Sequence, residues 1–378
     1  MARLEVPQGQ FELTRYPEKS HPSLRAWDAA DELLLFHIDE IKAQLPSQPQ
    51  LCIFNENFGA LATALNPWQP ISISDSFLCH QGTQNNYLLN KLECHPSLCL
   101  SSTSSLSATA DLVLIKIPKT LALLEHQLHQ LKPHITPDTR IIAAGMVKHI
   151  HRSTLELFTR IIGPTHTSLA KKKARLIFSE PDSSIQSTGS PYPSYYQLDE
   201  TQHQICNQAN VFCREKLDIG TRLFLQHLPT NTEAQDIIDL GCGNGIVGLI
   251  AAERNPQATV HFVDESYMAV ASAETNFKQA FGIGRVAKFE VGNCLDSYPP
   301  ASADLILNNP PFHQQQVVGD HIAWLMFQQS YDCLRQGGEL WVVGNRHLGY
   351  HNKLKKLFGN CKTMASNAKF VILKADKE

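Results

Sequence analysis

The 378-residue sequence lacks the features that mark membrane, secreted and zinc-binding proteins. No apolar run approaches the ~18 residues that a transmembrane helix needs, and the first residues contain no apolar signal-peptide core. None of the ten cysteines stands in a C-x-x-C pair, so the usual signals of a zinc ribbon and of a thioredoxin-like site are absent. We therefore expect a soluble cytoplasmic protein with no membrane contact, no metal and no disulfide framework.

A strong excess of one charge is also missing. The chain has 33 lysines and arginines against 36 aspartates and glutamates, which gives a formal net charge of −3. This balance excludes a histone-like polycation, although a local basic face could still bind RNA. At ~100–200 residues per domain, the length predicts two or three domains.

The clearest break in the sequence is a segment rich in Pro, Gly and Ser, from Pro181 to Ser194. It predicts a linker over residues 181–202, between a first domain at 1–180 and a second domain at 203–378. On both sides of it, short apolar strands alternate with helical segments. In the second half, we expect strands over 236–240 and 339–343 and helices over 246–254 and 321–334. This order is typical of an α/β fold in which a mostly parallel sheet carries helices on both faces.

The two halves resemble each other in sequence. The string Ala110-Asp-Leu-Val-Leu matches Ala303-Asp-Leu-Ile-Leu at four of five positions. Gly59 follows an apolar strand in the first half as Gly245 follows one in the second. We therefore predict two tandem Rossmann-like domains that are copies of one fold.

In the second half, the segment Asp239-Leu-Gly-Cys-Gly-Asn-Gly245 lies at the junction of an expected strand and an expected helix. Its glycines allow a tight turn and a close approach of the backbone to a ligand, beside a helix N-terminus that favours electronegative groups. The glycines of this loop are Gly241, Gly243 and Gly245. A dinucleotide-binding loop would instead follow the pattern G-x-G-x-x-G.

Further polar positions follow the neighbouring strands. Asp264 ends the next expected strand, where its carboxylate could accept hydrogen bonds from both ribose hydroxyls of a nucleoside. Asn293 and Cys294 follow the third expected strand, where a side chain and a backbone N–H could hold the edge of an adenine. Together with the glycine loop, these residues predict a pocket for an adenosine-containing cofactor.

The segment Asn309-Pro310-Pro311-Phe312 ends the fourth expected strand. Its prolines fix the backbone and remove N–H donors, so the loop presents hydrogen-bond acceptors. The side-chain oxygen of Asn309 and the carbonyl of Pro310 could both accept from one –NH₂ group and direct its nitrogen lone pair toward an electrophile, while Phe312 stacks on the base. Beside an adenosine pocket, this loop indicates methyl transfer from S-adenosylmethionine to a planar –NH₂ group.

The glycine loop, Asp264 and the Asn309–Phe312 loop together resemble those of class I S-adenosylmethionine-dependent amino-methyltransferases. The segment Val211–Leu223 and the duplicated half are similar to bacterial ribosomal RNA guanine-N2 methyltransferases, which carry a degenerate N-terminal copy of the catalytic domain. Residues Leu24–Leu35 resemble the large-subunit branch of that family more than its small-subunit branch.

The resemblance implies an rRNA (guanine-N2)-methyltransferase that uses S-adenosylmethionine to modify one guanine of 23S rRNA, guanine 1835 in that branch. It implies that Asp218 and Thr221 line the methionine end of the cofactor or the target base. The other implied cofactor contacts are Asp239, Gly241, Gly243, Gly245, Asp264, Asn293 and Cys294. The implied catalytic residues are Asn309, Pro310, Pro311 and Phe312. We expect a monomer whose partner is 23S rRNA.

The first half has lost this chemistry. Aligned on its one shared loop glycine, it carries other residue types at the key positions: Ile53, Asn55, Asn57 and Lys116. A loop that has asparagines in place of the first two glycines cannot bring its backbone close to a cofactor. We hypothesise that this half binds or positions RNA, because basic clusters occupy residues 148–152 and 171–175, and a third lies at 346–356 in the second half.

Several alternatives remain open. A small-subunit 16S rRNA guanine-N2 methyltransferase has the same layout. A glutamine-N5 methyltransferase of release factors shares the Asn-Pro-Pro-aromatic loop, but it usually has Tyr at the position of Phe312 and lacks a duplicated half; DNA adenine-N6 methylation uses the same chemistry. The last alternative is a non-catalytic RNA-binding assembly factor, which the intact Asp239 loop and Asn309 oppose.

Overall fold

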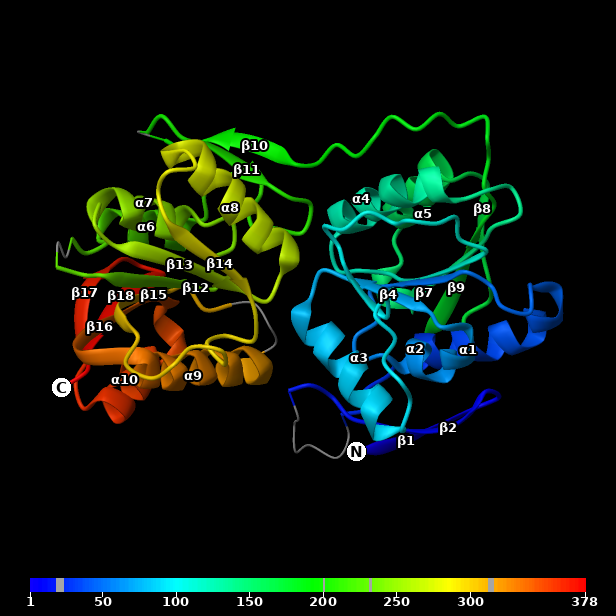
Figure 1. Cartoon of the computed structure of the whole chain (residues 1–378), viewed down its shortest axis with the longest axis horizontal. Coiled ribbons are helices and arrows are strands. Elements are labelled where there is room, and N and C mark those ends of the chain that lie inside the picture. Colours follow the sequence, from blue (N-terminus) through cyan, green and yellow to red (C-terminus); the bar gives the residue numbers. More distant parts are fainter. Residues whose placement is uncertain (18–23, 200, 231–232, 312–315) are drawn as a thin grey trace. The chain divides into compact units, whose positions relative to one another are not determined.

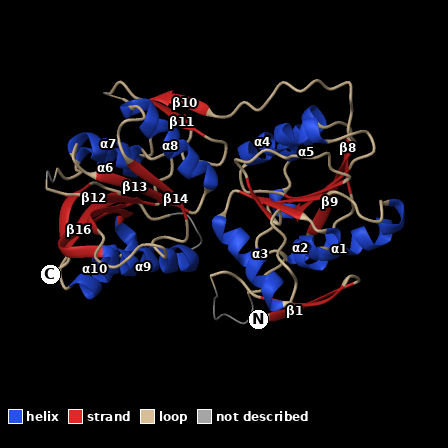
Figure 2. Ribbon diagram, in the orientation of Figure 1, coloured by secondary structure: helices blue, strands red, loops and turns tan. Residues whose placement is uncertain are grey.

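A computed structural model of the chain describes residues 1–17, 24–199, 201–230, 233–311 and 316–378. The chain forms two compact units, Met1–Tyr192 (unit 1) and Pro193–Glu378 (unit 2). Each unit contains a seven-stranded sheet between layers of helices (Figure 1, Figure 2). Within the described ranges, no helix is both long and apolar enough to span a membrane, and no group of three or more His, Cys, Asp or Glu side chains could hold a metal ion.

Unit 1 begins with a hairpin of two strands, β1 (Ala2–Val6) and β2 (Gly9–Leu13). Its larger sheet has the order β5-β4-β3-β6-β7-β9-β8, in which β9 runs antiparallel to both neighbours. The strands of this sheet are β3 (Leu51–Phe54), β4 (Ile71–Ser74), β5 (Cys99–Ser101), β6 (Leu112–Lys116), β7 (Arg140–Met146), β8 (Thr165–Thr167) and β9 (Ala174–Ser179). The α-helices are α1 (Ala29–Ile41), α2 (Ala60–Ala64), α3 (Phe77–Leu89), α4 (Leu121–Leu131) and α5 (Arg152–Ile161). Short 3-10 turns are η1 (Lys42–Gln44), η2 (Asn66–Trp68), η3 (Lys132–His134) and η4 (Val147–His149).

Unit 2 also begins with a hairpin, β10 (Ser194–Gln197) and β11 (Gln204–Asn207). Its larger sheet has the order β14-β13-β12-β15-β16-β18-β17, in which β18 runs antiparallel to both neighbours. The strands of this sheet are β12 (Asp236–Leu240), β13 (Thr259–Asp264), β14 (Ala287–Val291), β15 (Ala303–Asn308), β16 (Leu334–Asn345), β17 (Lys362–Ser366) and β18 (Phe370–Asp376). The helices are α6 (Ile219–Gln226), α7 (Ile246–Arg254), α8 (Tyr267–Phe281), α9 (Gln316–Cys333) and α10 (Tyr350–Phe358), with the 3-10 turn η5 (Arg346–Leu348).

Successive residues of the central strands pack alternately into two separate cores, one on each face of the sheet. In unit 2, Ile237 packs with α6, α7 and α8, whereas Ile238 packs with α9 and α10. In unit 1, Ile53 packs with α1, α2 and α3, whereas Phe54 packs with α4 and α5. Because both faces are covered, the strands are continuous apolar runs rather than alternating ones.

The two sheets have the same strand order, which confirms the predicted fold of two tandem Rossmann-like domains. Their registers also agree. Phe54 pairs with Ile115 in unit 1, where Leu240 pairs with Asn308 in unit 2. Lys116, which follows Ile115, is therefore the structural equivalent of Asn309.

The repeated Ala-Asp-Leu string has a structural reason. Oδ2 of Asp111 accepts a hydrogen bond from the backbone N of Gln50 at 2.8 Å, and Oδ2 of Asp304 accepts one from the backbone N of Gln235 at 2.7 Å. Each bond ties the start of one central strand to the start of its neighbour. The shared aspartate therefore serves the sheet rather than a ligand.

A buried asparagine shows that the repeat extends to the hairpins, which the sequence patterns did not reveal. Nδ2 of Asn86 on α3 donates to the carbonyls of Thr14 and Phe58, and its Oδ1 accepts from the backbone N of Thr14. Asn276 on α8 makes the same three bonds to the end of β11 and to the glycine loop of unit 2. The hairpin β1–β2 is thus the counterpart of β10–β11, and β10 lies within residues 181–202 but belongs to unit 2.

The sequence patterns located most central elements within one or two residues. The expected strand 236–240 and helix 246–254 have these bounds in the structure. The helix expected over 321–334 begins earlier, at Gln316, and the strand expected over 339–343 is the middle of the longer β16. The ten cysteines all lie in the described part of the chain, and none forms a disulfide.

Candidate active site

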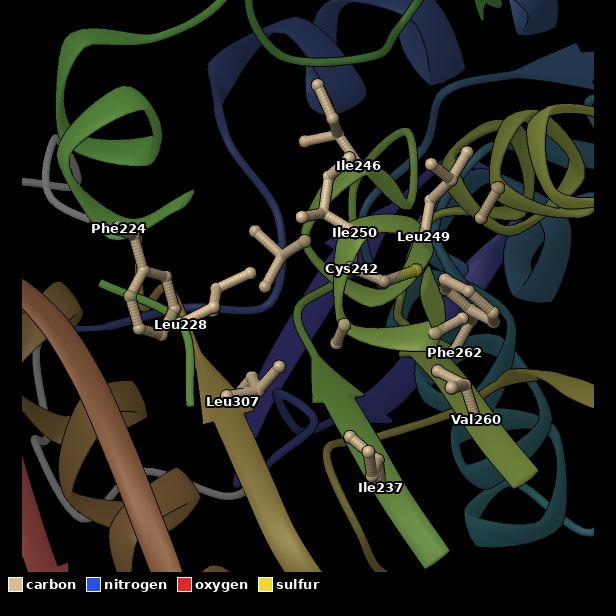
Figure 3. Packing of buried hydrophobic residues seen from close by; sticks show 14 of the residues in the cluster. Phe224, Leu228, Ile237, Cys242, Ile246, Leu249, Ile250, Val260, Phe262 and Leu307 are labelled. Carbon is tan, nitrogen blue, oxygen red and sulfur yellow. The ribbon is translucent and has the colours of Figure 1, made fainter. Parts of the chain in front are cut away.

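The glycine loop, residues 241–245, leaves the carboxyl end of β12 and leads into α7. The backbone N–H groups of Gly241 and Cys242 donate to the carbonyl of Val263 on β13 at 2.8 and 3.0 Å. The side chain of Cys242 is buried in the core with Leu249 and Phe262 (Figure 3). This anchoring fixes the course of the loop from its inner side.

The loop glycines have different functions. All three have positive φ, the left-handed region that disfavours side chains. A Cβ on Gly245 would lie 2.6 Å from Cβ of Ala273 on α8, so this glycine is required by packing. A Cβ on Gly243 would meet no atom within 4 Å, whereas one on Gly241 would lie 3.3 Å from Cε of Met326 on α9 and 3.7 Å from the carbonyl oxygen of Asn309. Position 243 therefore borders open space, and position 241 packs against α9 and the Asn309 loop.

Asp239 lies near the end of β12 and is buried. Its Oδ2 accepts a hydrogen bond from the backbone N of Gly248 in α7 at 2.7 Å. Burial raises the pKa of Asp239 to about 8, because the charged carboxylate loses its hydration. A cationic ligand at this edge of the sheet would favour the ionised form.

Asp264 connects the ends of three strands. Its Oδ2 accepts from the backbone N of Gly243 at 2.9 Å, and its Oδ1 accepts from the backbone N of Ser266 at 3.0 Å. Its carbonyl accepts from the backbone N of Gly292, which follows β14. The predicted ribose acid is thus held rigidly against the glycine loop.

Asn293 and Cys294 follow β14 at the same edge of the sheet. Nδ2 of Asn293 donates to Oδ2 of Asp296 at 2.7 Å, which fixes the turn. Cys294 adopts a φ of 52°, and burial raises the pKa of its thiol to about 12. This thiol stays neutral, which suits a packing role better than a nucleophilic one.

Asn309 directly follows β15 and has one satisfied and one unsatisfied polar atom. Its Nδ2 donates to Oγ1 of Thr221 at 3.1 Å. Its Oδ1 is buried and has no hydrogen-bond partner within the described ranges. Pro310 is buried and Pro311 is exposed, whereas Phe312 lies outside the residues that the structure describes.

Asp218 and Thr221 lie at the start of α6. Asp218 caps the helix, since its Oδ2 accepts from the backbone N of Thr221 at 2.9 Å. A Cβ on Gly220 between them would lie 2.9 Å from the ring of Phe370 on β18, so the helix start is packed closely on the sheet. The structure thus brings Thr221, suggested by sequence resemblance, into contact with the Asn309 loop.

Three buried asparagines that the sequence analysis did not single out hold the glycine loop in place. Nδ2 of Asn244 donates to Oδ1 of Asn207 at 2.9 Å, and Asn276 donates to the carbonyl of Asn244 at 2.9 Å. The matching position of Asn86 in the first half was the available signal for Asn276. For Asn207 the sequence offered none, because its hairpin strand is short.

Known proteins resemble this chain over its whole length. A family model described as "RLMG N-terminal domain" matches residues 1–183, and one described as "Methyltransferase small domain" matches residues 202–374. Proteins named "Ribosomal RNA large subunit methyltransferase G" from Streptomyces griseus and Erwinia tasmaniensis are 48% and 50% identical to this chain, over 100% of both chains in each case. One from Aeromonas salmonicida is 48% identical over 99% of both chains.

The chain belongs to the ribosomal RNA large subunit methyltransferase G family. It is therefore a methyltransferase, as the Asn309 loop predicted, and the sequence resemblance to the large-subunit branch is confirmed. A solved structure with the same fold is the T. thermophilus 16S rRNA N2 G1207 methyltransferase in complex with AdoMet and guanosine, with a TM-score of 0.74 at 19% identity. That match covers 100% of this chain and 98% of the solved one.

The edge of the sheet in unit 2 fits the predicted cofactor, S-adenosylmethionine. The open backbone at Gly243 leaves room for a ligand, and the carboxyl groups of Asp264 and Asp239 bind the backbone of the loop and of the helix that follows it. Acidic groups suit a cofactor with a sulfonium, an ammonium and two ribose hydroxyls. The match to the methyltransferase family model supports this assignment.

Proposed function

We propose that the chain methylates the exocyclic N2 amine of one guanine in 23S rRNA, using S-adenosylmethionine. The observation that carries the proposal is the buried Oδ1 of Asn309, just after β15, which has no hydrogen-bond partner among the described residues. Most buried polar atoms have a hydrogen-bond partner, so an exception at a loop beside a ligand site indicates a missing substrate donor. By resemblance the target is guanine 1835, and a single chain acts as a cytoplasmic monomer.

The residues of this chain would activate the amine by orienting it. Oδ1 of Asn309 and the carbonyl of Pro310 accept the two N–H groups of the amine, so the nitrogen becomes pyramidal and its lone pair is no longer conjugated with the base. S-adenosylmethionine supplies a methyl group on a sulfonium, whose C–S bond breaks with its electron pair on sulfur as the N–C bond forms. The methylated nitrogen then releases one proton to water, and no general base is needed for the attack.

The target base must leave its stack to reach Asn309. Turning a base out of a duplex costs a few kcal/mol, and the cost is smallest in an unpaired or irregular region. A single-stranded or loop site in the RNA therefore fits this pocket better than a regular helix.

Transfer of a tritiated methyl group to purified substrates tests the proposal. The full-length protein is incubated with deproteinised 23S rRNA, 16S rRNA and release factor, and labelled nucleosides are identified after digestion. We expect label in N2-methylguanosine of 23S rRNA. Label in 16S rRNA or release factor alone, or in none of the substrates, would contradict the proposal.

We further propose that unit 1 helps to hold the RNA through a surface of lysines. The backbone N of Val147 donates to the carbonyl of Lys173 at 2.8 Å, which brings residues 148–152 beside residues 171–173. The lysines 171–173 are exposed, and Nζ of Lys171 lies 5.5 Å from the exposed ring of Phe36. Cations interleaved with an aromatic ring suit a flexible RNA strand.

Salt dependence tests this surface. Replacing Lys171 and Lys173 by alanine should reduce the slope of log affinity against log salt concentration by about 0.7 per lost phosphate contact. Lys278→Ala is the matched control, because Lys278 is an exposed, ion-paired lysine on α8 of unit 2. An unchanged slope in the double variant would contradict the role of this surface.

A further inference from the structure

The hydroxyl of Thr221 lies between the helix cap Asp218 and the catalytic amide of Asn309. Its Oγ1 is 3.1 Å from Nδ2 of Asn309 and 3.4 Å from Oδ2 of Asp218. Thr221 is 6% exposed, so water does not readily replace either partner. We propose that Thr221, oriented by Asp218, is a positioning residue that sets which end of the Asn309 amide faces the target amine. This inference rests on the proposed function.

The chemistry of the three groups fixes the direction of the hydrogen bonds. An ionised carboxylate only accepts, so the proton of the Thr221 hydroxyl is directed to Asp218. The lone pairs of Oγ1 are then left to accept from Nδ2 of Asn309. As a result Oδ1 is turned away from Thr221, and this is the atom left without a partner.

The opposite orientation of the amide would stop the reaction. If Oδ1 faced Thr221, Nδ2 would face the substrate, and two N–H donors would meet at the target nitrogen. Because the two ends of an amide have nearly the same shape, packing discriminates poorly between these orientations. The Thr221 hydroxyl donates its proton to Asp218, so it can only accept from Asn309. It therefore selects the orientation in which Nδ2 faces Thr221.

Unit 1 supplies an independent observation at the equivalent positions. Asp28 caps α1 as Asp218 caps α6, and Asp31 is the third residue of its helix as Thr221 is of its own. Both acids bind Nζ of Lys116, the equivalent of Asn309, at 2.7 and 2.6 Å.

The contact between helix start and strand end is therefore present in both units, although its chemistry differs. In unit 1 a buried ion pair joins the two elements, and the residue at the position of Asn309 is a cation that has no acceptor atom. In unit 2 a neutral hydroxyl joins them and leaves one amide oxygen free. The difference fits a contact that is structural in unit 1 and orients a catalytic group in unit 2.

Four variants of the full-length protein test this inference: Thr221→Val, Thr221→Ser, Asp218→Asn and Thr63→Val. Thr221→Val removes the hydroxyl and keeps the side-chain shape, whereas Thr221→Ser keeps the hydroxyl. Asp218→Asn retains a good helix cap but can donate to Oγ1, which frees the hydroxyl proton for Oδ1 of Asn309. Thr63→Val is the matched control, because Thr63 is fully buried in unit 1 and its hydroxyl has no partner in the described part of the chain.

The measurements are kcat and KM with 23S rRNA, the Kd for S-adenosylmethionine by calorimetry, and the melting temperature. We expect Thr221→Val to lower kcat by about 10- to 100-fold, the usual effect of losing one critical hydrogen bond, with cofactor Kd and RNA KM within about twofold of wild type. Thr221→Ser should recover most of the turnover, Asp218→Asn should fall between the two, and Thr63→Val should match wild type.

Three results would overturn the inference. They are full turnover in Thr221→Val, a loss of cofactor affinity that equals the loss of turnover, and a Thr221→Ser variant as slow as Thr221→Val. The second result would instead make Thr221 a cofactor contact. Failure of the proposed function is distinguishable, because it shows as an inactive wild-type protein before any variant is compared.

Discussion

Unit 2 leaves polar groups available at the carboxyl edge of its sheet, whereas unit 1 satisfies the equivalent groups internally. In unit 1, Asn55 takes the place of Gly241 and has a similar φ, 61° against 72°. Its side-chain amide forms two hydrogen bonds with the amide of Gln127, at 2.7 and 2.8 Å. The side chain at this position thus bonds to α4, whereas in unit 2 a Cβ on Gly241 would lie 3.3 Å from Met326 on α9, the helix equivalent to α4.

A buried carboxyl group serves the same helix in both units but comes from a different position. Oδ2 of Asp239 accepts from the backbone N of Gly248 in α7, and Oε2 of Glu56 accepts from the equivalent backbone N of Ala62 in α2. Unit 1 therefore keeps the helix contact while losing the strand carboxylate, which is Ile53 there. The N–H group at the helix start needs an acceptor in both units. The carboxyl group that supplies the acceptor can stand at different positions in the sequence.

The glycine that both units retain is the one that packing demands. A Cβ on Gly59 would lie 2.7 Å from Cα of Thr83, and one on Gly245 would lie 2.8 Å from Cα of Ala273. Both glycines bring a helix start against the next helix. Of the two glycines that differ, Gly243 borders open space in unit 2, where a ligand could lie, whereas Gly241 packs against Met326.

The largest expected difference between the units is at their equivalent residues Asn309 and Lys116. Asn309→Ala should lower kcat by about 100- to 1,000-fold or more, as for other buried catalytic hydrogen-bonding groups, with cofactor Kd nearly unchanged. Lys116→Met should leave turnover intact, but it should destabilise the protein by about 3–5 kcal/mol because buried Asp31 loses its counter-ion. Methyl-transfer assays measure turnover, and denaturant unfolding measures stability, for both variants. Slow methyl transfer by Lys116→Met, or normal turnover by Asn309→Ala, would contradict a catalytic role for Asn309 and a structural role for Lys116.

The next largest effect separates the glycines. Gly245→Ala and Gly59→Ala should each destabilise their unit by about 3 kcal/mol or more, because the new Cβ meets helix backbone at a positive φ. Gly243→Asn copies Asn57 of unit 1, and its Cβ would meet no atom within 4 Å, so it should cost about 1 kcal/mol or less.

The readout for Gly243→Asn is cofactor binding. We expect the Kd for S-adenosylmethionine by calorimetry to rise by about tenfold or more, the effect of a few lost polar contacts, while the melting temperature changes little. Tight binding in this variant would show that the open backbone at position 243 does not border the cofactor.

The smallest effect concerns the two buried carboxyl groups. Burial raises the pKa of Glu56 to about 7 and that of Asp239 to about 8. Both groups are raised above their unfolded values, so their contribution to stability is complete below about pH 4 and is lost as the pH rises through 7 to 8. Glu56→Gln and Asp239→Asn keep an acceptor for the helix and remove this loss.

Glu56→Gln and Asp239→Asn should therefore each be more stable than wild type at pH 8, and should differ little from wild type at pH 5. Each kcal/mol gained should raise the melting temperature by about 2–4 °C. Glu56→Gln should retain cofactor affinity, whereas Asp239→Asn should lose it. Calorimetric melting at both pH values checks the first expectation and titration with S-adenosylmethionine the second. Equal stability gains at pH 5 and pH 8 would contradict the raised pKa values.

Local sequence alone was enough for much of the fold and for the chemistry of the loops. Apolar runs of four to six residues separated by helical periods specify covered parallel strands, so β12 and α7 were located correctly. The Asn309 loop and the glycine spacing likewise carry their chemistry in adjacent residues. These features depend on neighbours in the chain, and a pattern records them directly.

Contacts between distant residues were decided only by folding. The hairpins β1–β2 and β10–β11 were missed because a strand of four or five residues has too little pattern of its own and is held by an asparagine about 70 residues away. The contact of Thr221 with Asn309 spans 88 residues, and no local signal records it. The residue types thus determined which polar groups are present at the site. The packing of α6 on the sheet determined that Nδ2 of Asn309 is paired with Thr221, whereas Oδ1 has no partner among the described residues.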